Sequence, residues 1–225
     1  MSSTNTDDRT TKARIRDAVI EVVAEGGLDA MTARNVAEAA GVSAGLVIHH
    51  FDSMDGLRAA CDDYVARVIR EYKRETISQG PRIDVLAAIR QSGLETLPGY
   101  LAAVLSDDSP AVATLVDRLV DDAEEYMQQG IESGMMQPTE NVRGRAQVLT
   151  MWSLGALVMH RHVERLFGYD PTDSTMNSDP SAVAAYAAPG YEILGKGIFT
   201  EEFADNLRNS FKDIPAKENS RQLLR

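Results

Sequence analysis

Residues 32–51 read TARNVAEAAGVSAGLVIHHF, and the prediction of the fold rests mainly on them. It contains Thr32 and Ser43, whose hydroxyls are of the kind that accept hydrogen bonds from the first turn of a helix. Gly41 lies between them and allows the sharp turn that joins two short helices. The spacing therefore predicts one helix from Thr32 to Gly41 and another that begins at Ser43.

Two helices joined by so short a turn must cross closely. Ala37 supplies a small residue at the crossing, four positions before Gly41. Apolar residues fall on the facing sides of both helices, namely Val36, Ala40, Val42 and Val47. The pattern predicts a helix-turn-helix, in which the second helix presents its N-terminal end to a DNA groove or a phosphate. A plain helical hairpin is the alternative.

The same residues match a hydrolase motif. Gly41-Val42-Ser43-Ala44-Gly45 has the form G-x-S-x-G of a nucleophile elbow, which requires a turn from a strand into a helix. The residues before it have a helical pattern, and no run in the chain alternates as a strand does. We therefore predict that the protein is not an enzyme, with a serine hydrolase that uses Ser43 kept as an alternative.

Apolar residues recur every three or four positions along most of the remaining chain, which is the period of an amphipathic helix. We expect helices over residues 10–25, 54–78, 83–98, 100–105, 110–135, 139–167, 182–199 and 201–211. Ser53 and Ser109 are expected N-caps, with Pro110 at a first helical position. The stretch from Val148 to Met159 is apolar on nearly every side, so both faces need a cover. The fold class is all-α, with about ten helices.

Composition limits the function. The chain has 225 residues, 44% of them hydrophobic, which excludes a disordered protein. Its net charge is −11, yet residues 1–50 hold five basic and seven acidic side chains and are less acidic than the rest. Four cations gather between Arg9 and Arg16. They form either a solvated helix face or a set of phosphate contacts.

The location follows from Cys61 and from the N-terminus. A single cysteine excludes a disulfide framework and suits a reducing compartment. Residues 1–11 are polar and lack the apolar stretch of a secretory signal. Residues 146–159 are fewer than the roughly 20 apolar residues that cross a bilayer. We expect a cytoplasmic protein without a membrane partner.

Residues 32–43 resemble the DNA-binding segment of the tetracycline-repressor (TetR) family, together with Gly45, residues 47–51, Ser53 and Leu57. The similarity is specific within residues 11–60. Beyond them only the number, length and spacing of the helices are similar. The resemblance implies a three-helix DNA-binding domain, a larger helical domain that binds a small molecule, and a homodimer.

Domain limits follow from the expected helices. Residues 1–53 form a helix-turn-helix domain with a polar N-terminal tail, residues 54–213 a helical regulatory and dimerisation domain, and residues 214–225 a C-terminal tail.

The sequence departs from the family pattern at two positions. Ile48 stands where an aromatic residue is frequent, and Met54 where a lysine is frequent. Both usual residues commonly contact phosphate. Without them, the second helix of the helix-turn-helix, which would read the DNA bases (the reading helix), is almost without charge. Ala44 and Leu46 are suited instead to thymine methyl groups. The expected DNA-binding residues are Arg9, Lys12, Arg14, Thr32, Arg34, Ser43, Ala44, Leu46 and His49.

The histidines do not predict a metal site. His49 and His50 are adjacent, so they point to different sides of a helix, with His50 inside and His49 toward DNA. His160 and His162 also diverge, and no nearby acid completes a ligand set. We predict no metal and no cofactor.

The helices at 139–167 and 182–199 are the expected dimer interface. Small residues crowd the second of them between Ala184 and Gly197 and allow backbones to approach closely. Packing within one chain is the alternative. A two-fold dimer would place its reading helices about 34–36 Å apart, on a near-palindromic operator.

An effector site requires a cavity lined mainly by apolar and aromatic side chains. The candidates, chosen as inward-facing, are Tyr64, Val68, Tyr100, Val104, Met127, Ile131, Trp152 and Met159. Core packing is the alternative for each. Methionine and tyrosine suggest an uncharged, apolar ligand.

The resulting hypothesis is a repressor that a ligand releases from DNA by moving the helix at 54–78. A helical dimer that has lost DNA binding, and acts through ligand or protein contacts, is a further alternative.

Overall fold

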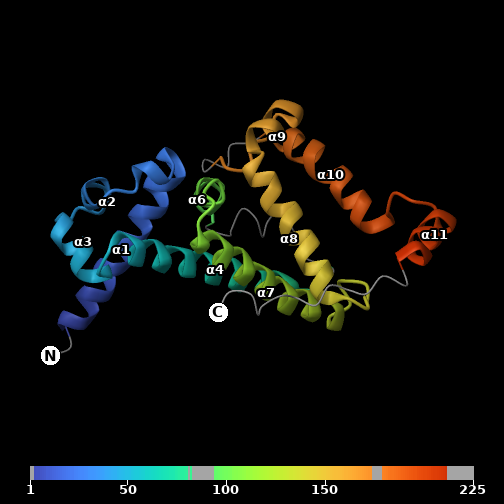
Figure 1. Ribbon diagram of the computed structural model, residues 1–225, viewed down its shortest axis with the longest axis horizontal. Coiled ribbons are helices and arrows are strands. Elements are labelled where there is room, and N and C mark those ends of the chain that lie inside the picture. Colours follow the sequence, from blue (N-terminus) through green and yellow to red (C-terminus); the bar gives the residue numbers. More distant parts are fainter. Residues whose placement is uncertain (1–2, 81, 83–93, 174–178, 212–225) are drawn as a thin grey trace. The chain divides into compact units, whose positions relative to one another are not determined.

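A computed structural model describes residues 3–80, 82, 94–173 and 179–211 (Figure 1). These residues form ten α-helices and one 3-10 helix, and no strand is present among them. The helices are α1 (Ser3–Gly26), η1 (Leu28–Ala30), α2 (Ala33–Ala40), α3 (Ala44–Phe51), α4 (Met54–Ser78), α6 (Leu97–Val104), α7 (Pro110–Glu132), α8 (Val142–Val158), α9 (His160–Phe167), α10 (Pro180–Lys196) and α11 (Glu201–Phe211). The all-α prediction is confirmed.

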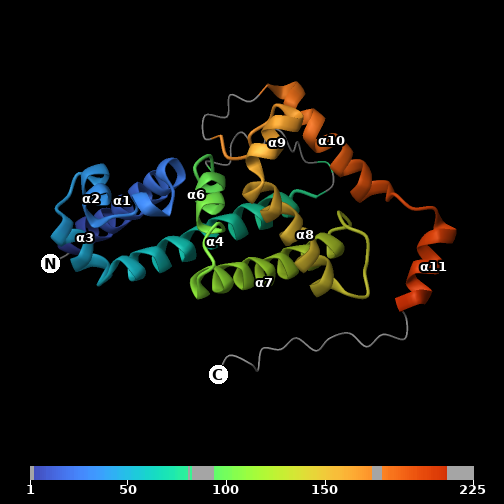
Figure 2. The same ribbon diagram turned by 45° about the horizontal axis from the view of Figure 1, so that its top comes forward.

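The chain divides into two compact units, Met1–Val183 and Ala184–Arg225. In the first unit α4 packs beside α7, α7 beside α8, and α1 against α2 and α6 (Figure 2). Ile15 and Val19 of α1, Val47 of α3, and Leu57 and Val65 of α4 are buried in one core. That core joins the N-terminal helices to the long helix α4.

All four expected N-cap residues stand at helix N-termini, and three of them cap the helix with a side-chain hydrogen bond. The hydroxyls of Thr32 and Ser43 each accept from a backbone N–H three residues ahead, both at 3.2 Å, and the hydroxyl of Ser53 does the same at 2.9 Å. Ser109 precedes α7, with Pro110 at the first helical position as predicted, but the Ser109 hydroxyl makes no capping bond. The N–H of Val112, a natural partner, donates to the Ser109 carbonyl oxygen instead (3.0 Å).

Several helix limits differ from those predicted. Helix α1 begins at Ser3, seven residues before the expected start at Thr10. The region expected as one helix over 139–167 is two helices, with the break at Met159 (φ −96°, ψ 19°). Asn141 begins α8, because its side chain accepts from the N–H of Gly144 (2.7 Å). Most of the helix expected at 83–98 lies outside the described residues.

We predicted that both faces of α8 are covered by other residues. The described residues leave one part of its apolar surface exposed. Val148 is 66% exposed and Trp152 45% exposed. Met159, at the break, is 56% exposed. Among the described residues, no helix is long and apolar enough to cross a membrane.

Candidate nucleic-acid interface

The turn between α2 and α3 has the predicted helix-turn-helix geometry. Gly41 adopts the left-handed conformation (φ 64°, ψ 41°), which only glycine adopts without steric cost. The N–H of Val42 donates to the carbonyl oxygen of Ala37 (2.9 Å) and closes the turn. Val36 and Val47 are fully buried on either side of it. The sequence fixes both helices locally, and their packing fixes the angle between them.

The outer face of α3 carries little charge. Ala44, Ile48 and His49 are exposed, and Leu46 is half-buried beside them. Ser43 stands exposed at the N-terminal end of the helix, with its hydroxyl used for capping. It follows helix α2, so the strand that a hydrolase elbow requires does not precede it. The face can offer methyl groups and an imidazole to a DNA groove.

The cations predicted to contact DNA differ in their surroundings. Arg34 is exposed on α2. Arg14 donates to the carbonyl oxygen of Ala40 (2.9 Å) and so holds the end of α2 against α1. The ammonium of Lys12 lies 5.8 Å from the centre of the Phe51 ring. Arg9 lies in α1, and its side chain is not described. Of the predicted cations whose side chains are described, Arg34 is therefore the best placed for an external phosphate.

The two neighbouring histidines partly follow the prediction. His49 is exposed, whereas His50 is half-buried. Their ring centres lie 5.7 Å apart.

The structure brings only some of the predicted effector residues together, since Tyr64 and Val68 pack against the same core as Tyr100 and Val104. Tyr100 and Val104 of α6 are fully buried, and Met127 belongs to a separate buried cluster with Ala123 and Ala146. Trp152 and Met159 are exposed, so the expectation that they face inward is wrong. Because α8 is apolar on nearly every side, its sequence does not indicate which of its side chains are buried by the rest of the chain. Val68, Ile131 and Tyr64 are half-buried.

A buried polar contact links α4 to α6, and sequence reasoning missed it. The Tyr100 hydroxyl donates to Asp62 Oδ1 (2.6 Å), and Arg58 pairs with Asp107 (2.8 Å) beside them. Burial raises the pKa of Asp62, although the Tyr100 hydrogen bond and the charge of Arg58 act in the opposite direction. Burial raises the pKa of Tyr100 as well. Helix α6 also touches α1, because a Cβ at Gly99 would lie 3.0 Å from that of Ala24.

Another unpredicted contact involves His160. Its Nδ1 lies 3.3 Å from Asp170 Oδ1, and the Thr172 hydroxyl donates to the same carboxylate oxygen (2.7 Å). One acid therefore does lie beside His160, although among the described residues no group of three or more potential metal ligands includes them. The loop after α9 brings Asp170 back to the start of that helix, which spacing along the sequence does not reveal.

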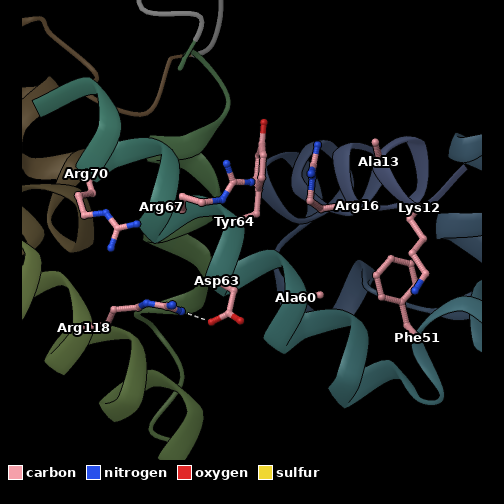
Figure 3. A pocket seen from close by; sticks show the side chains of 10 residues that line it. All are labelled: Lys12, Ala13, Arg16, Phe51, Ala60, Asp63, Tyr64, Arg67, Arg70 and Arg118. Atoms are coloured by element: carbon pink, nitrogen blue, oxygen red, sulfur yellow. Dashed lines mark hydrogen bonds and ion pairs between the residues drawn. The ribbon is translucent and has the colours of Figure 1, made fainter. Parts of the chain in front are cut away.

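A cavity of about 520 Å³ lies where α1 and the end of α3 meet α4 and α7 (Figure 3). Its described lining is Lys12, Ala13, Arg16, Phe51, Ala60, Asp63, Tyr64, Arg67, Arg70 and Arg118. The lining combines cations with two aromatic rings. The guanidinium carbon of Arg16 lies 3.4 Å from the centre of the Tyr64 ring, and that of Arg67 lies 5.2 Å from it.

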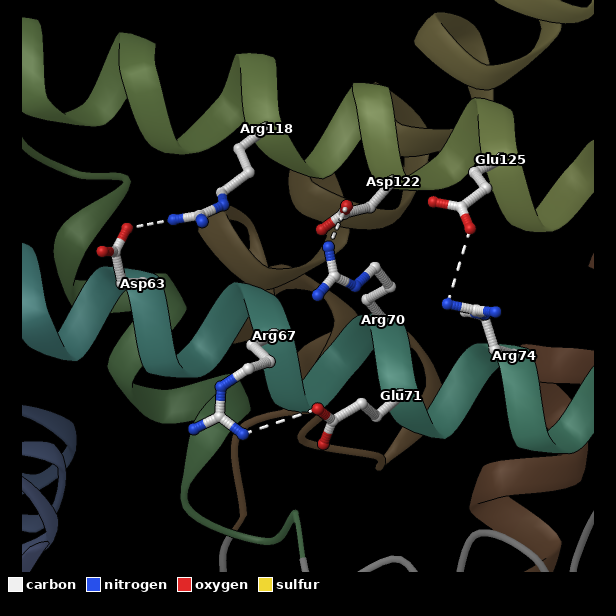
Figure 4. A network of polar contacts seen from close by, with 8 residues as sticks. All are labelled: Asp63, Arg67, Arg70, Glu71, Arg74, Arg118, Asp122 and Glu125. Carbon is white, nitrogen blue, oxygen red and sulfur yellow. Dashed lines mark hydrogen bonds and ion pairs between the residues drawn. The ribbon is translucent and has the colours of Figure 1, made fainter.

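Ion pairs line the α4–α7 interface (Figure 4). Asp63 pairs with Arg118, Arg70 with Asp122 (3.4 Å) and Arg74 with Glu125 (3.5 Å). Asp122 is buried, and burial raises its pKa. The other carboxylates stay exposed to solvent, where an ion pair contributes little to stability.

Comparisons with known proteins agree with this geometry. Residues 15–61 match the family described as bacterial regulatory proteins, tetR family, and residues 94–200 match the tetracyclin repressor-like C-terminal domain. The HTH-type transcriptional regulatory protein RaaS of Mycobacterium tuberculosis is 33% identical over 199 residues, which cover 86% of this chain and 89% of that protein.

A solved structure of a TetR-family transcriptional regulator from Rhodococcus sp. has the same fold. Its TM-score is 0.57 at 17% identity, over 80% of this chain and 97% of that chain. Together, the helix-turn-helix geometry and these matches show that the chain belongs to the TetR family of transcriptional regulators.

Proposed function

We propose that the protein is a homodimeric repressor, released from a near-palindromic operator by a small apolar ligand. The observation that carries this proposal is the capped α2–α3 pair, whose outer face is free of the chain's own packing at Ala44 and His49. A helix presented in this way fits a major groove. The proposed domain limits remain 1–53, 54–213 and 214–225, and the proposed location is cytoplasmic.

DNA contacts are proposed in two groups. Ala44, Leu46 and His49 read base edges from α3. Thr32, Arg34 and Ser43 hold the backbone, together with the α1 cations Arg9, Lys12 and Arg14. Phosphate contacts position a protein on DNA and carry most of the salt dependence of binding. Arg14 and Lys12 must release their present contacts to take part, so Arg34 is expected to contribute most.

A dimer is supported by apolar surface on two helices, each considered by itself. On α8, Val148, Met151 and Trp152 are exposed. On α10, Tyr191 is 61% exposed and Leu194 is 56% exposed. Exposed apolar side chains in such numbers mark interaction surfaces. We propose that 139–167 and 182–199 meet their counterparts in a second copy.

Ligand release needs a connection from the regulatory helices to the reading head. Helix α6 provides one, because it contacts α1 through Gly99 and bonds to α4 through Tyr100. A ligand near the predicted residues Val68, Tyr100 and Val104 would move α6 and α4 together. It shifts the equilibrium only by the difference between its affinities for the two states.

Selection from a random duplex pool tests the proposal. We expect enrichment of a two-fold symmetric sequence whose half-site centres lie about one helical turn apart. The absence of charge on α3 favours the alternative of a helical dimer without DNA binding. Failure to enrich any sequence, by a dimeric protein with a native helical spectrum, would establish that alternative.

A further inference from the structure

We infer that the cavity between α1, α4 and α7 is a binding site for a small organic phosphate, a ligand different from the proposed apolar effector. Tyr64 is the one predicted effector residue in its described lining. The described lining holds Lys12, Arg16, Arg67, Arg70 and Arg118 and one carboxylate, that of Asp63. Arg16, Arg67 and Arg70 also pair with carboxylates outside the lining, those of Asp17, Glu71 and Asp122. The whole chain has a net charge of −11. Five cations gathered around one hollow in so acidic a chain favour an anionic ligand.

The cations still have donors to offer. A guanidinium carries five N–H groups in a planar fork that suits phosphate oxygens. Arg67 contacts Glu71 through one nitrogen (3.5 Å), and Arg70 contacts Asp122 through one nitrogen (3.4 Å). Arg16 is more fully engaged, because two of its nitrogens donate to Asp17 (2.9 and 2.6 Å). The Arg16 and Arg70 side chains are mostly shielded from water. Shielding from water strengthens the attraction between such a group and an anion.

The aromatic rings indicate that the ligand is more than an inorganic ion. Phe51 and Tyr64 both line the cavity, from α3 and α4. Figure 3 shows the Tyr64 ring standing between the side chains of Arg67 and Arg16. A volume of about 520 Å³ is within the range of small-molecule sites. The chemistry fits a phosphate group joined to an apolar or aromatic part.

The position of the cations argues against DNA as the source of the phosphate. Arg70 lies sixteen residues after Met54 on α4, about 24 Å along the helix axis. Arg118 belongs to α7, in the regulatory part of the chain. A duplex seated on α3 would not reach both of them and also fill a concave cavity. A small ligand there touches the reading head and the regulatory helices at once.

Asp63 has a defined role in this site. It pairs with Arg118 but is 69% exposed, so it can turn into solvent when a phosphate takes its place. Asp63 therefore already neutralises one of the cations of the cavity, that of Arg118. Removal of the Asp63 charge is expected to free Arg118 and to tighten phosphate binding.

Calorimetric titration with phenyl phosphate, in buffer of matched chloride ionic strength, tests the site without any DNA. We expect one ligand per protomer, with a Kd below about 1 mM. Arg67→Gln and Arg118→Gln each weaken binding about tenfold, the loss of one charge-assisted hydrogen bond. Asp63→Asn tightens it. Arg74→Gln is the matched control, since Arg74 forms an α4–α7 ion pair but does not line the cavity.

Three results would overturn the inference. One is the absence of saturable binding up to about 10 mM phenyl phosphate. Another is an equal loss of binding in Arg74→Gln and Arg118→Gln. The third is a loss of DNA affinity in Arg67→Gln and Arg118→Gln with phenyl phosphate binding unchanged, which would assign the cations to the DNA backbone. Circular dichroism confirms that each variant is folded, and a positive titration stands whether or not the protein binds an operator.

Discussion

The reading helix α3 and the cavity behind it belong to one compact unit but carry very different charge. Helix α3 has no lysine or arginine between Ala44 and Phe51. The cavity between α1, α4 and α7 is lined by five cations from those helices. Five cations thus surround the cavity, whereas α3 has no lysine or arginine. If the proposed function holds, base reading by α3 depends on shape, on methyl contacts and on two copies of the helix in a dimer.

A reading helix without charge is expected to bind DNA weakly by itself, so the proposed dimer would need the helix-turn-helix domains of both protomers. Loss of the dimer therefore gives the largest expected effect. Val148→Glu combined with Val158→Glu places charges on the exposed apolar face of α8. We expect monomers by light scattering, and an operator affinity lowered by about 100-fold or more because the two heads no longer act together. Gln128→Glu, an exposed change on α7, is the control. A dimer that persists with full affinity would place the interface elsewhere.

The helix-turn-helix depends on the left-handed backbone conformation of Gly41. Gly41→Val forces a β-branched residue into the left-handed region, at a cost of about 1–2 kcal/mol or more. We expect a lower unfolding temperature and an operator affinity reduced about tenfold, since the angle between α2 and α3 is lost. Gly41→Asn is tolerated better in that region and serves as the comparison. Equal behaviour of both variants would show that the turn is not under this constraint.

The missing aromatic residue on α3 offers a gain of function. Ile48 is exposed at a position where the family pattern has a tyrosine. Ile48→Tyr should add a phosphate contact and raise operator affinity about tenfold or more, because one hydrogen bond to a charged group contributes about 1.5–3 kcal/mol. Ile48→Phe supplies the ring without the hydroxyl and should give little gain in an anisotropy titration. If both variants gain equally, stacking or packing rather than a phosphate contact is responsible.

The fold of the head could be predicted because its signals are local. Thr32, Ser43 and Ser53 each bond a backbone N–H three residues ahead, and Gly41 takes the one conformation that its turn requires. The break at Met159 carries no comparable signal, because neither proline nor glycine stands there. Local chemistry thus identifies where the N-terminal helices begin, and it fails where a helix is interrupted without a breaking residue.

The sites were harder to predict for a different reason. Arg16, Arg67 and Arg118 come together only through the packing of α1, α4 and α7, so their positions in the sequence give no sign of a shared cavity. The same holds for Tyr100 and Asp62, thirty-eight residues apart. For α8, an apolar pattern on every side predicted burial, and it did not distinguish cover by the same chain from cover by a partner.

The buried Asp62 should make the stability of the regulatory region depend on pH. Its folded pKa is raised from the ordinary value of 3.8, chiefly by burial. The associated stability is fully present below that unfolded value and is lost as pH rises through the folded pKa. Asp62→Asn still accepts from Tyr100 but cannot ionise. We expect its free energy of unfolding, relative to the wild type, to increase across this window and then to level off.

Tyr100→Phe sharpens the same measurement. It removes the hydrogen bond that favours the ionised Asp62, so the window should extend to higher pH. Urea unfolding at a series of pH values measures both effects. Parallel pH profiles for the wild type and Asp62→Asn would contradict the account of this contact.

The central claim is that the helix-turn-helix, and not the cavity between α1, α4 and α7, binds the DNA duplex. The salt dependence of DNA binding tests this claim most directly. Anisotropy titrations on the selected operator compare Arg34→Ala with Arg118→Gln. The logarithm of the affinity falls linearly with the logarithm of the salt concentration. Loss of one phosphate contact reduces the magnitude of this slope by about 1. We predict that decrease for Arg34→Ala, with the slope of Arg118→Gln equal to that of the wild type. An unchanged slope in Arg34→Ala, with a lower slope in Arg118→Gln, would contradict it.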